Sequence, residues 1–378
     1  MIYLDNAATS FPKPEKVINA VAGAMRTIGA NPGRAGHTLS LAAGRVVWNC
    51  REEISKLINN DNPELISFGF NCTDALNLAI FGCVKAGDHV ITTMLEHNSA
   101  LRPINGMVQK GLITWSLLAP GDEGYVSAEQ IEAAVQPNTK LIVVNHVSNV
   151  TGIAQPVVEI GKVAAKHGVL FLVDGAQSLG MLEVDVKKIG CDMLAFPGHK
   201  GLLGPMGTGG LYIREGVALE PFREGGTGSS SESMIQPDEL PEAYESGTLN
   251  AVGIAGLLVG TRMVNARREA FYAHEKVLGD YLWNELQSIG GVKTLTNRAP
   301  DCAVVPFNVD GYSSGQVATE LNRRHIGVRG GLHCAPAVHT HYGTINLGAA
   351  RASVGISNTK ADVDALLTAV MDIARNGI

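Results

Sequence analysis

The sequence predicts an α/β fold with a large domain built on a mostly parallel β-sheet and a smaller α+β domain. Between about residues 60 and 215, short apolar runs alternate with amphipathic stretches of helical period. The apolar runs are continuous, as expected for parallel strands that are buried on both faces of a sheet. At 378 residues the chain is also long enough for two domains, each with its own core.

Strands and helices alternate along the first part of the chain. Strands are predicted at residues 65–68, 89–93, 140–144, 169–173 and 191–196. Helices are predicted between them, at residues 74–83, 98–110 and 157–167. After about residue 255 we predict the elements 256–289 (helix), 304–308 (strand), 314–324 (helix), 326–329 (strand) and 360–375 (helix). We place the large domain at residues 16–255 and the small domain at residues 1–15 and 256–378.

Composition and charge exclude several classes of protein. The net charge of −6 and the pI of about 6.0 argue against nucleic acid or an anionic membrane as a partner. The start, MIYLDNAATS, lacks a secretory signal pattern, and no apolar run approaches the roughly 20 residues that span a bilayer. We therefore expect a cytoplasmic protein. The six cysteines form no C-x-x-C pair, so neither a disulfide framework nor a structural metal site is expected.

Polar residues follow several predicted strands, at the sheet edge where α/β proteins bind ligands. Residues 71–74 open a helix whose N-terminus could bind a phosphate, with Thr73 adding a hydroxyl; an ordinary helix cap is the alternative. His97 follows the next strand, and a structural role is the alternative for it. Asp174 follows a later strand and needs a cation or a donor, such as the protonated ring nitrogen of pyridoxal phosphate (PLP).

Lys200 lies in the glycine-rich stretch GHKGLLGPMGTGG, directly after an apolar run. A lysine removed from water tends to lose its proton, and a neutral amine can form a Schiff base with an aldehyde. A phosphate seat, a histidine, an acid and this lysine, each at a strand end, together predict a PLP enzyme. An NAD-binding protein is excluded because no G-x-G-x-x-G pattern follows a first strand with an acidic residue about 20 positions further on.

Nine short motifs carry a resemblance to a known family. They are YLDNAAT (3–9), GHTLS (36–40), EHNS (96–99), HVSNVTG (146–152), VDGAQS (173–178), GHK (198–200), ESGTLN (245–250), RGGLHCAP (329–336) and RASVGISNT (351–359). Over essentially its full length the chain resembles the cysteine desulfurase/selenocysteine lyase family of the class V aminotransferase superfamily. The resemblance implies the PLP-dependent transferase fold (type I, aspartate aminotransferase-like) with a seven-stranded sheet, PLP as cofactor, and a homodimer whose sites are shared between subunits.

The resemblance also implies roles for individual residues. Lys200 would bind the cofactor as a Schiff base, Asp174 would pair with its ring nitrogen, and His97 would stack on the ring and take part in proton transfer. The other cofactor contacts would come from Gln177 (ring hydroxyl), Asn149 (ring or substrate), Cys72, and the phosphate-binding residues Thr73, His199 and, from the other subunit, Thr248. The substrate would contact Arg351 through its carboxylate, and also Asn149, Ala7 and His37. For His37, a capping or core role is an equal alternative.

Cys334 distinguishes the possible reactions. It lies in a glycine-rich loop between an arginine and a histidine, both of which could favour the thiolate. The resemblance implies that its thiolate takes sulfur from L-cysteine as a persulfide, giving L-alanine, and that an acceptor protein then receives the sulfur. The alternatives are a selenocysteine lyase that gives L-alanine and selenide, a thiol-independent aminotransferase, or a metal or persulfide carrier based on His333, Cys334, His339 and His341.

The chain departs from its relatives at several positions. Cys72 and Pro197 stand where hydroxyl side chains are common, and each lost hydrogen bond to phosphate would be worth about 1.5–3 kcal/mol. PLP would then be held less tightly, or by backbone N–H groups or residues 227–231 instead. Leu332 replaces a frequent histidine, which could alter the preference for sulfur or selenium. The stretch 225–242 looks longer than in many relatives, which leaves the acceptor open.

Overall fold

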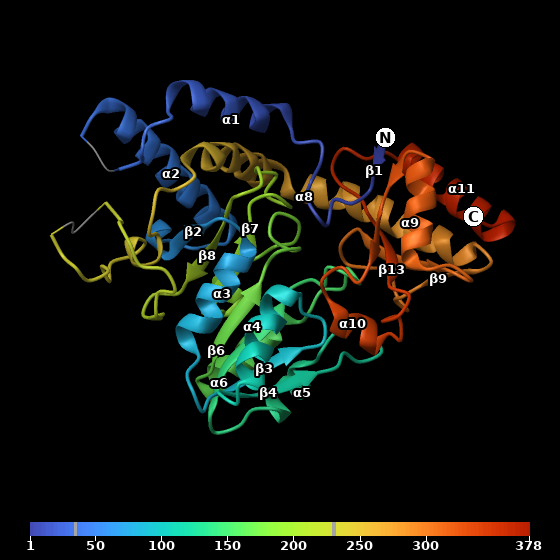
Figure 1. Ribbon diagram of the computed structural model, residues 1–378, viewed down its shortest axis with the longest axis horizontal. Coiled ribbons are helices and arrows are strands. Elements are labelled where there is room, and N and C mark those ends of the chain that lie inside the picture. Colours follow the sequence, from blue (N-terminus) through green and yellow to red (C-terminus); the bar gives the residue numbers. More distant parts are fainter. Residues whose placement is uncertain (34–35, 229–231) are drawn as a thin grey trace.

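A seven-stranded β-sheet lies at the centre of the larger part of the molecule (Figure 1). In sheet order its strands are β2 (Ile66–Gly69), β8 (Gly209–Ile213), β7 (Met193–Pro197), β6 (Leu170–Asp174), β5 (Thr139–Asn145), β3 (His89–Thr93) and β4 (Thr114–Leu118). Only β8 runs antiparallel to its neighbours, so the predicted mostly parallel seven-stranded sheet is confirmed. This computed structural model describes residues 1–33, 36–228 and 232–378, so residues 229–231 of the predicted 227–231 contact lie outside it.

Alternate side chains of the central strands enter two different cores. Leu141 and Val143 of β5 pack in a core with residues of α3 and α4, whereas Ile142 and Val144 pack in a core with residues of α2 and α6. Both faces are therefore buried, which explains the continuous apolar runs. The helices of this part are α1 (Glu15–Thr27), α2 (Thr38–Leu57), α3 (Cys72–Cys83), α4 (Asn98–Gln109), α5 (Ala128–Ala133), α6 (Val157–His167) and α7 (Val186–Ile189), with short 3₁₀ turns η1 (Pro63–Leu65) and η2 (Glu242–Tyr244).

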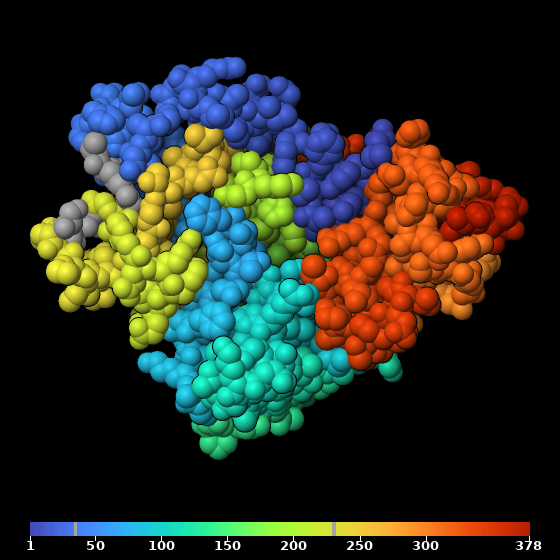
Figure 2. All heavy atoms as spheres, viewed as in Figure 1, coloured from blue at the N-terminus to red at the C-terminus, as the bar shows by residue number. Residues whose placement is uncertain are grey.

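The C-terminal part is built on a four-stranded antiparallel sheet. Its order is β12 (Arg329–Gly331), β13 (Ala349–Ser353), β10 (Val304–Val309) and β9 (Val292–Thr294). The helices α9 (Ser314–Arg323), α10 (Pro336–His341) and α11 (Lys360–Asn376) accompany it. The N-terminal strand β1 (Ile2–Tyr3) pairs in parallel with β11 (Ile326–Gly327), and Figure 2 shows the blue N-terminal segment against the orange C-terminal part.

The long helix α8 (Ala251–Ser288) connects the two parts (Figure 1). Near its N-terminus, Ile254 and Leu257 pack in the core of the large sheet. Near its C-terminus, Leu282 and Leu286 pack in the core of the C-terminal part. Among the described residues, no helix is long and apolar enough to cross a membrane.

Several predicted elements differ from the structure for local reasons. Helix α8 begins five residues before its predicted start because the Asn250 side chain accepts a hydrogen bond from the Gly253 amide at 2.9 Å, which caps the helix. The single strand predicted at 326–329 is wrong, since β11 pairs with β1 while β12 pairs with β13. Elements absent from the prediction are the strands β1, β4, β8, β9 and β13 and the helices α1, α2, α5, α7 and α10.

Candidate active site

A cavity of about 220 Å³ lies at the carboxyl ends of β5, β6 and β7. These parallel strands end side by side, so the polar residues that follow them meet at one edge of the sheet. The predicted site residues that line this cavity are Ala7, Cys72, Thr73, His97, Asn149, Asp174, Gln177, His199, Lys200 and Arg351. The structure thus brings together residues from motifs spread over almost the whole chain.

Lys200 enters the cavity from the turn that follows β7. This turn needs glycine at position 198, because a Cβ atom there would lie 2.0 Å from Oγ1 of Thr208. Burial lowers the pKa of the Lys200 ammonium, and nearby Arg351 acts in the same direction, whereas Asp174 opposes the shift. A larger fraction of this lysine is therefore a neutral, nucleophilic amine than at an exposed site.

Asp174 is the last residue of β6 and is 4% exposed. One carboxylate oxygen, Oδ1, accepts hydrogen bonds from the Ala176 amide at 2.9 Å and from Sγ of Cys72 at 3.5 Å. Among the described residues, no group donates to the other oxygen, Oδ2. Burial raises the pKa of the Cys72 thiol well above its usual value, so Cys72 acts as a neutral donor. Oδ2 of Asp174 thus remains available to accept a hydrogen bond from a donor in the cavity.

The N-termini of α3 and α4 also border the cavity. The Asn71 side chain caps α3 by accepting from the Asp74 amide at 2.9 Å. Thr73, in the first turn of α3, lies 2.8 Å (Oγ1 to Oγ) from Ser99 in the first turn of α4. Two helix N-termini with free backbone N–H groups form a suitable seat for a phosphate. Ser99 lies within the motif EHNS, but no role was predicted for it.

Arg351 is 1% exposed and is held from two sides. Its Nη1 donates to the backbone oxygen of Asn149 at 2.9 Å, and its Nη2 forms an ion pair with Oδ1 of Asp5 at 2.6 Å. Its Nε has no partner among the described residues. Gln177 donates to the backbone oxygen of Ala7 at 2.9 Å, which fixes the amide beside the cavity. Asp5 is a partner that the sequence analysis did not identify, although it lies in the motif YLDNAAT.

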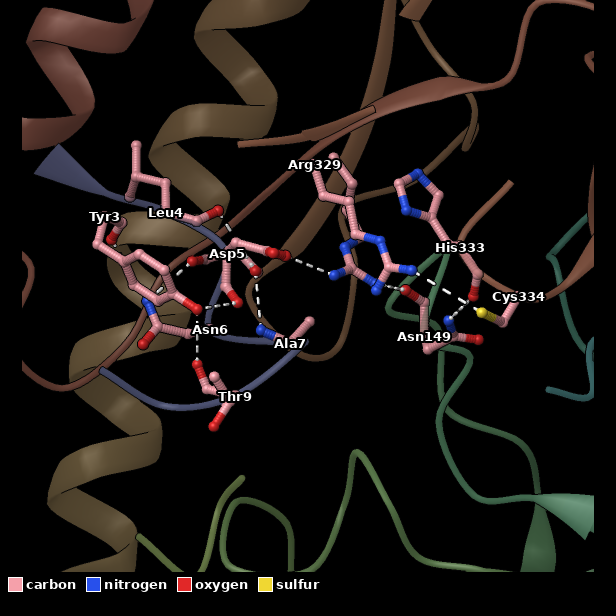
Figure 3. Close-up of polar contacts among 12 residues, drawn as sticks. Tyr3, Leu4, Asp5, Asn6, Ala7, Thr9, Asn149, Arg329, His333 and Cys334 are labelled. Carbon is pink, nitrogen blue, oxygen red and sulfur yellow. Dashed lines mark hydrogen bonds and ion pairs between the residues drawn. The ribbon is translucent and has the colours of Figure 1, made fainter. Parts of the chain in front are cut away.

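Cys334 is exposed on the loop that follows β12. His333 and Cys334 adopt left-handed backbone angles (φ +52° and +57°), which are uncommon for residues other than glycine. The loop is tied to the cavity because the Asn149 side chain donates to the His333 oxygen at 2.8 Å and the Asn98 amide donates to the Cys334 oxygen at 2.7 Å. Figure 3 shows Arg329 extending toward Cys334, with its Nη2 3.8 Å from Sγ.

His333 carries no positive charge that could favour the Cys334 thiolate. Its Nε2 bonds to the Ala349 oxygen at 2.9 Å, and burial lowers the pKa of its imidazole to about 3, so the ring is neutral. The prediction that both flanking residues favour a thiolate is therefore wrong for His333. Arg329 is the charged group that contacts the Cys334 sulfur, and it also lines the cavity.

The structure places the predicted site residues His37, Thr248 and His199 in different surroundings. His37 is exposed and caps α2, with its Nδ1 accepting from the Ser40 amide at 3.2 Å; the structure thus shows its capping role. Thr248 is exposed and lies away from the cavity of its own chain. His199 lines the cavity, and burial lowers its pKa to about 4, so it is neutral near pH 7. Pro197 also lines the cavity, where it offers no hydroxyl.

The proposed metal-binding cluster does not form a site. His333 bonds to a backbone oxygen, and Nδ1 of His339 lies 2.8 Å from Oγ1 of Thr344. Within residues 1–33, 36–228 and 232–378, no group of three or more His, Cys, Asp or Glu side chains is arranged to hold a metal ion.

The fold and the cavity define a class of α/β protein in which a lysine, an acid and two helix N-termini line one cavity at the carboxyl ends of the parallel strands. Comparison with known proteins gives the family. Residues 2–366 match the family model described as Aminotransferase class-V, and the chain belongs to this family.

The named relatives cover almost the whole chain. A probable cysteine desulfurase of Methanothermobacter thermautotrophicus is 34% identical over 386 aligned positions, covering 100% of this chain and 95% of the relative. A cysteine desulfurase of Salmonella agona is 32% identical, with 99% and 94% covered. Among solved structures, the apo cysteine desulfurase of Thermococcus onnurineus gives a TM-score of 0.92 at 34% identity, covering 99% of this chain and 95% of that one. The desulfurase CsdA of Escherichia coli gives 0.88 at 26% identity, with 99% and 94% covered.

Proposed function

We propose that this protein is a PLP-dependent cysteine desulfurase, which removes the sulfur of L-cysteine as a persulfide on Cys334 and releases L-alanine. The observation that carries the proposal is the placement of Cys334. Its exposed thiol contacts Arg329, which lines the cavity that contains Lys200 and Asp174. Sequence relatives and structural neighbours named as cysteine desulfurases support this activity.

The residues around the cavity fit PLP. Lys200 offers an amine for the aldehyde, and Oδ2 of Asp174 is open to a ring N–H. The N-terminus of α3, with the Thr73 backbone N–H, and His199 would hold the phosphate, and Gln177 would lie at the ring hydroxyl. When bound, PLP supplies an electron sink for the negative charge that develops at the substrate Cα.

The protein's own residues would perform the remaining steps. The guanidinium of Arg351 would hold the substrate carboxylate, for which its planar fork is suited. The Lys200 amine would take the Cα proton, because its lowered pKa leaves it able to act as a base. The Cys334 sulfur would bond to the substrate sulfur while the Cβ–S bond breaks. The electron pair of that bond would stay on the carbon fragment, which gains a proton to become alanine.

We infer a homodimer from the position of Thr248. This residue lies outside the cavity of its own chain, in an exposed segment beside Phe70. The side chains of Phe70, Met206 and Phe222 are 47%, 67% and 43% exposed, and a second subunit would cover such apolar surface. The acceptor of the persulfide sulfur would be a further protein that reaches exposed Cys334.

The decisive experiment measures alanine formation from L-cysteine and from L-selenocysteine in parallel. Cys334→Ala should abolish turnover of cysteine, because no thiol remains to take the sulfur. A selenocysteine lyase would keep much of its selenocysteine turnover in that variant, since a selenol is more acidic and C–Se is weaker than C–S. A thiol-independent aminotransferase would need a keto-acid acceptor, and its activity would be unchanged in Cys334→Ala.

Lys200→Ala tests the cofactor assignment. The variant should lose all these activities and also the visible absorbance of lysine-bound PLP. If the absorbance survives, another residue binds the cofactor and the assignment of Lys200 is wrong.

A further inference from the structure

Ser99 joins the two helix N-termini at the cavity. Its Oγ lies 2.8 Å from Oγ1 of Thr73 and 2.8 Å from Nδ1 of His97. Its backbone N–H also donates to Nδ1 of His97, at 3.1 Å. All three residues line the cavity. We propose that Ser99 is a positioning residue that holds His97 as the neutral tautomer with its proton on Nε2.

The donors around Nδ1 decide the tautomer. A backbone N–H can only donate, so the Ser99 amide requires a lone pair on Nδ1 of His97. The Ser99 hydroxyl must also turn its proton toward Nδ1, because two lone pairs facing each other at 2.8 Å would repel. Since its proton is then used, the Ser99 oxygen accepts from the Thr73 hydroxyl. The hydrogen bonds therefore run from Thr73 through Ser99 to His97.

The same geometry keeps the ring neutral. A proton on Nδ1 would displace the Ser99 amide and remove the cap of α4. Burial lowers the pKa of His97. Of the charged groups that face it, Lys200, Arg329 and Arg102 lower the pKa further, whereas Asp174 raises it. Nε2 of His97 carries the ring proton and remains available to donate a hydrogen bond into the cavity.

The tautomer assigns His97 a specific task in the proposed reaction, and this step rests on the proposed function. Nε2 carries a proton, so it can donate a hydrogen bond to an acceptor in the cavity but cannot take the Cα proton. Removal of that proton then belongs to Lys200. His97 acts as a donor at the ring instead of the proton-transfer group that the sequence analysis predicted.

The test uses PLP-loaded protein with ¹⁵N-labelled histidine, in which the His97 signals are identified by their loss in His97→Gln. The parent should show a protonated Nε2 and an unprotonated Nδ1 from pH 6 to 8. Ser99→Ala removes one of two donors to Nδ1 and should raise the pKa of His97 by about one unit, the size expected for one hydrogen bond. Ser99→Thr keeps the hydroxyl and should restore the parent value.

Thr73→Val provides a second control, because Ser99 still donates to His97 and the tautomer should stay unchanged. The proposal is overturned if the parent carries the proton on Nδ1, or if Ser99→Ala alters neither the tautomer nor the pKa of His97. The signals do not require turnover. A protein that shows them but does not convert cysteine would therefore contradict the proposed function and leave the role of Ser99 intact.

Discussion

The buried ion pair between Arg51 and Glu245 provides a sharp test of how the segment before α8 is held. The two side chains form paired hydrogen bonds, with Nη1 2.7 Å from Oε1 and Nη2 2.5 Å from Oε2. Nη1 also donates to the Ile66 oxygen at 2.6 Å, and Oε1 accepts from the Phe68 amide at 2.6 Å. The pair thus links α2, β2 and the segment that leads to Thr248.

We expect Arg51→Met to lower the free energy of unfolding by about 3–5 kcal/mol. The magnitude follows from burial, since Arg51 is 4% and Glu245 8% exposed. Removing the guanidinium leaves an uncompensated carboxylate in the protein interior and an unpaired Ile66 oxygen. The methionine retains most of the side-chain volume, so the loss reports the charge and the hydrogen bonds more than a cavity.

Glu245→Gln added to Arg51→Met gives the matched comparison. The amide has no charge, and its oxygen can still accept from the Phe68 amide. The double variant should therefore be more stable than Arg51→Met alone, by about 1–2 kcal/mol. Urea unfolding followed by far-UV circular dichroism measures all three proteins. A loss below about 1 kcal/mol for Arg51→Met, or a double variant less stable than the single one, would refute this reasoning.

Three further predictions follow from the site and its surroundings. Cys72→Ala removes a donor to Asp174 and should weaken PLP binding about three- to tenfold in a fluorescence titration, whereas Cys72→Ser should bind like the parent; equal affinities would contradict this. Burial lowers the pKa of His146 to about 4 and that of His333 to about 3, so below pH 6.5 the unfolded chain takes up protons that the folded chain does not. Each of these two histidines should lower the free energy of unfolding by about 2 kcal/mol between pH 7 and pH 5. In urea unfolding, the His146→Gln variant should therefore lose about 2 kcal/mol less than the parent over this pH range. Equal losses in the two proteins would argue against burial of a neutral His146 ring. Arg351→Lys should raise KM for L-cysteine at least about tenfold, and an unchanged KM would exclude carboxylate binding there.

Much of the fold could be predicted because its central strands are buried on both faces. Strands β5 and β6 contain continuous apolar runs, and β3 is rich in β-branched residues, so all three show a clear strand pattern. In contrast, β4 is exposed or half-buried along its length, and β8 begins with two glycines, so neither shows that pattern. Residues 326–329 are divided between two sheets because β11 pairs with β1 and β12 pairs with β13. These partners are distant in the sequence, so local periodicity cannot predict the division.

The site residues could be predicted where strand ends and motifs coincide, as for Asp174 and Lys200. Other features required the three-dimensional arrangement. Ser99 becomes relevant only because α3 and α4 begin beside one another, and this brings its hydroxyl to Thr73. The neutral state of His333 follows from its burial, which a flanking position in a glycine-rich loop does not indicate.

Helix α8 has a mechanical consequence for the reaction. Its 38 residues extend for about 57 Å as one continuous rod that is embedded in the cores on either side of the cavity. The C-terminal part, which carries Cys334, therefore cannot rotate freely relative to the large sheet. Any opening for an incoming substrate or a departing sulfur has to come from bending of α8 or from local movement of the loop that carries Cys334.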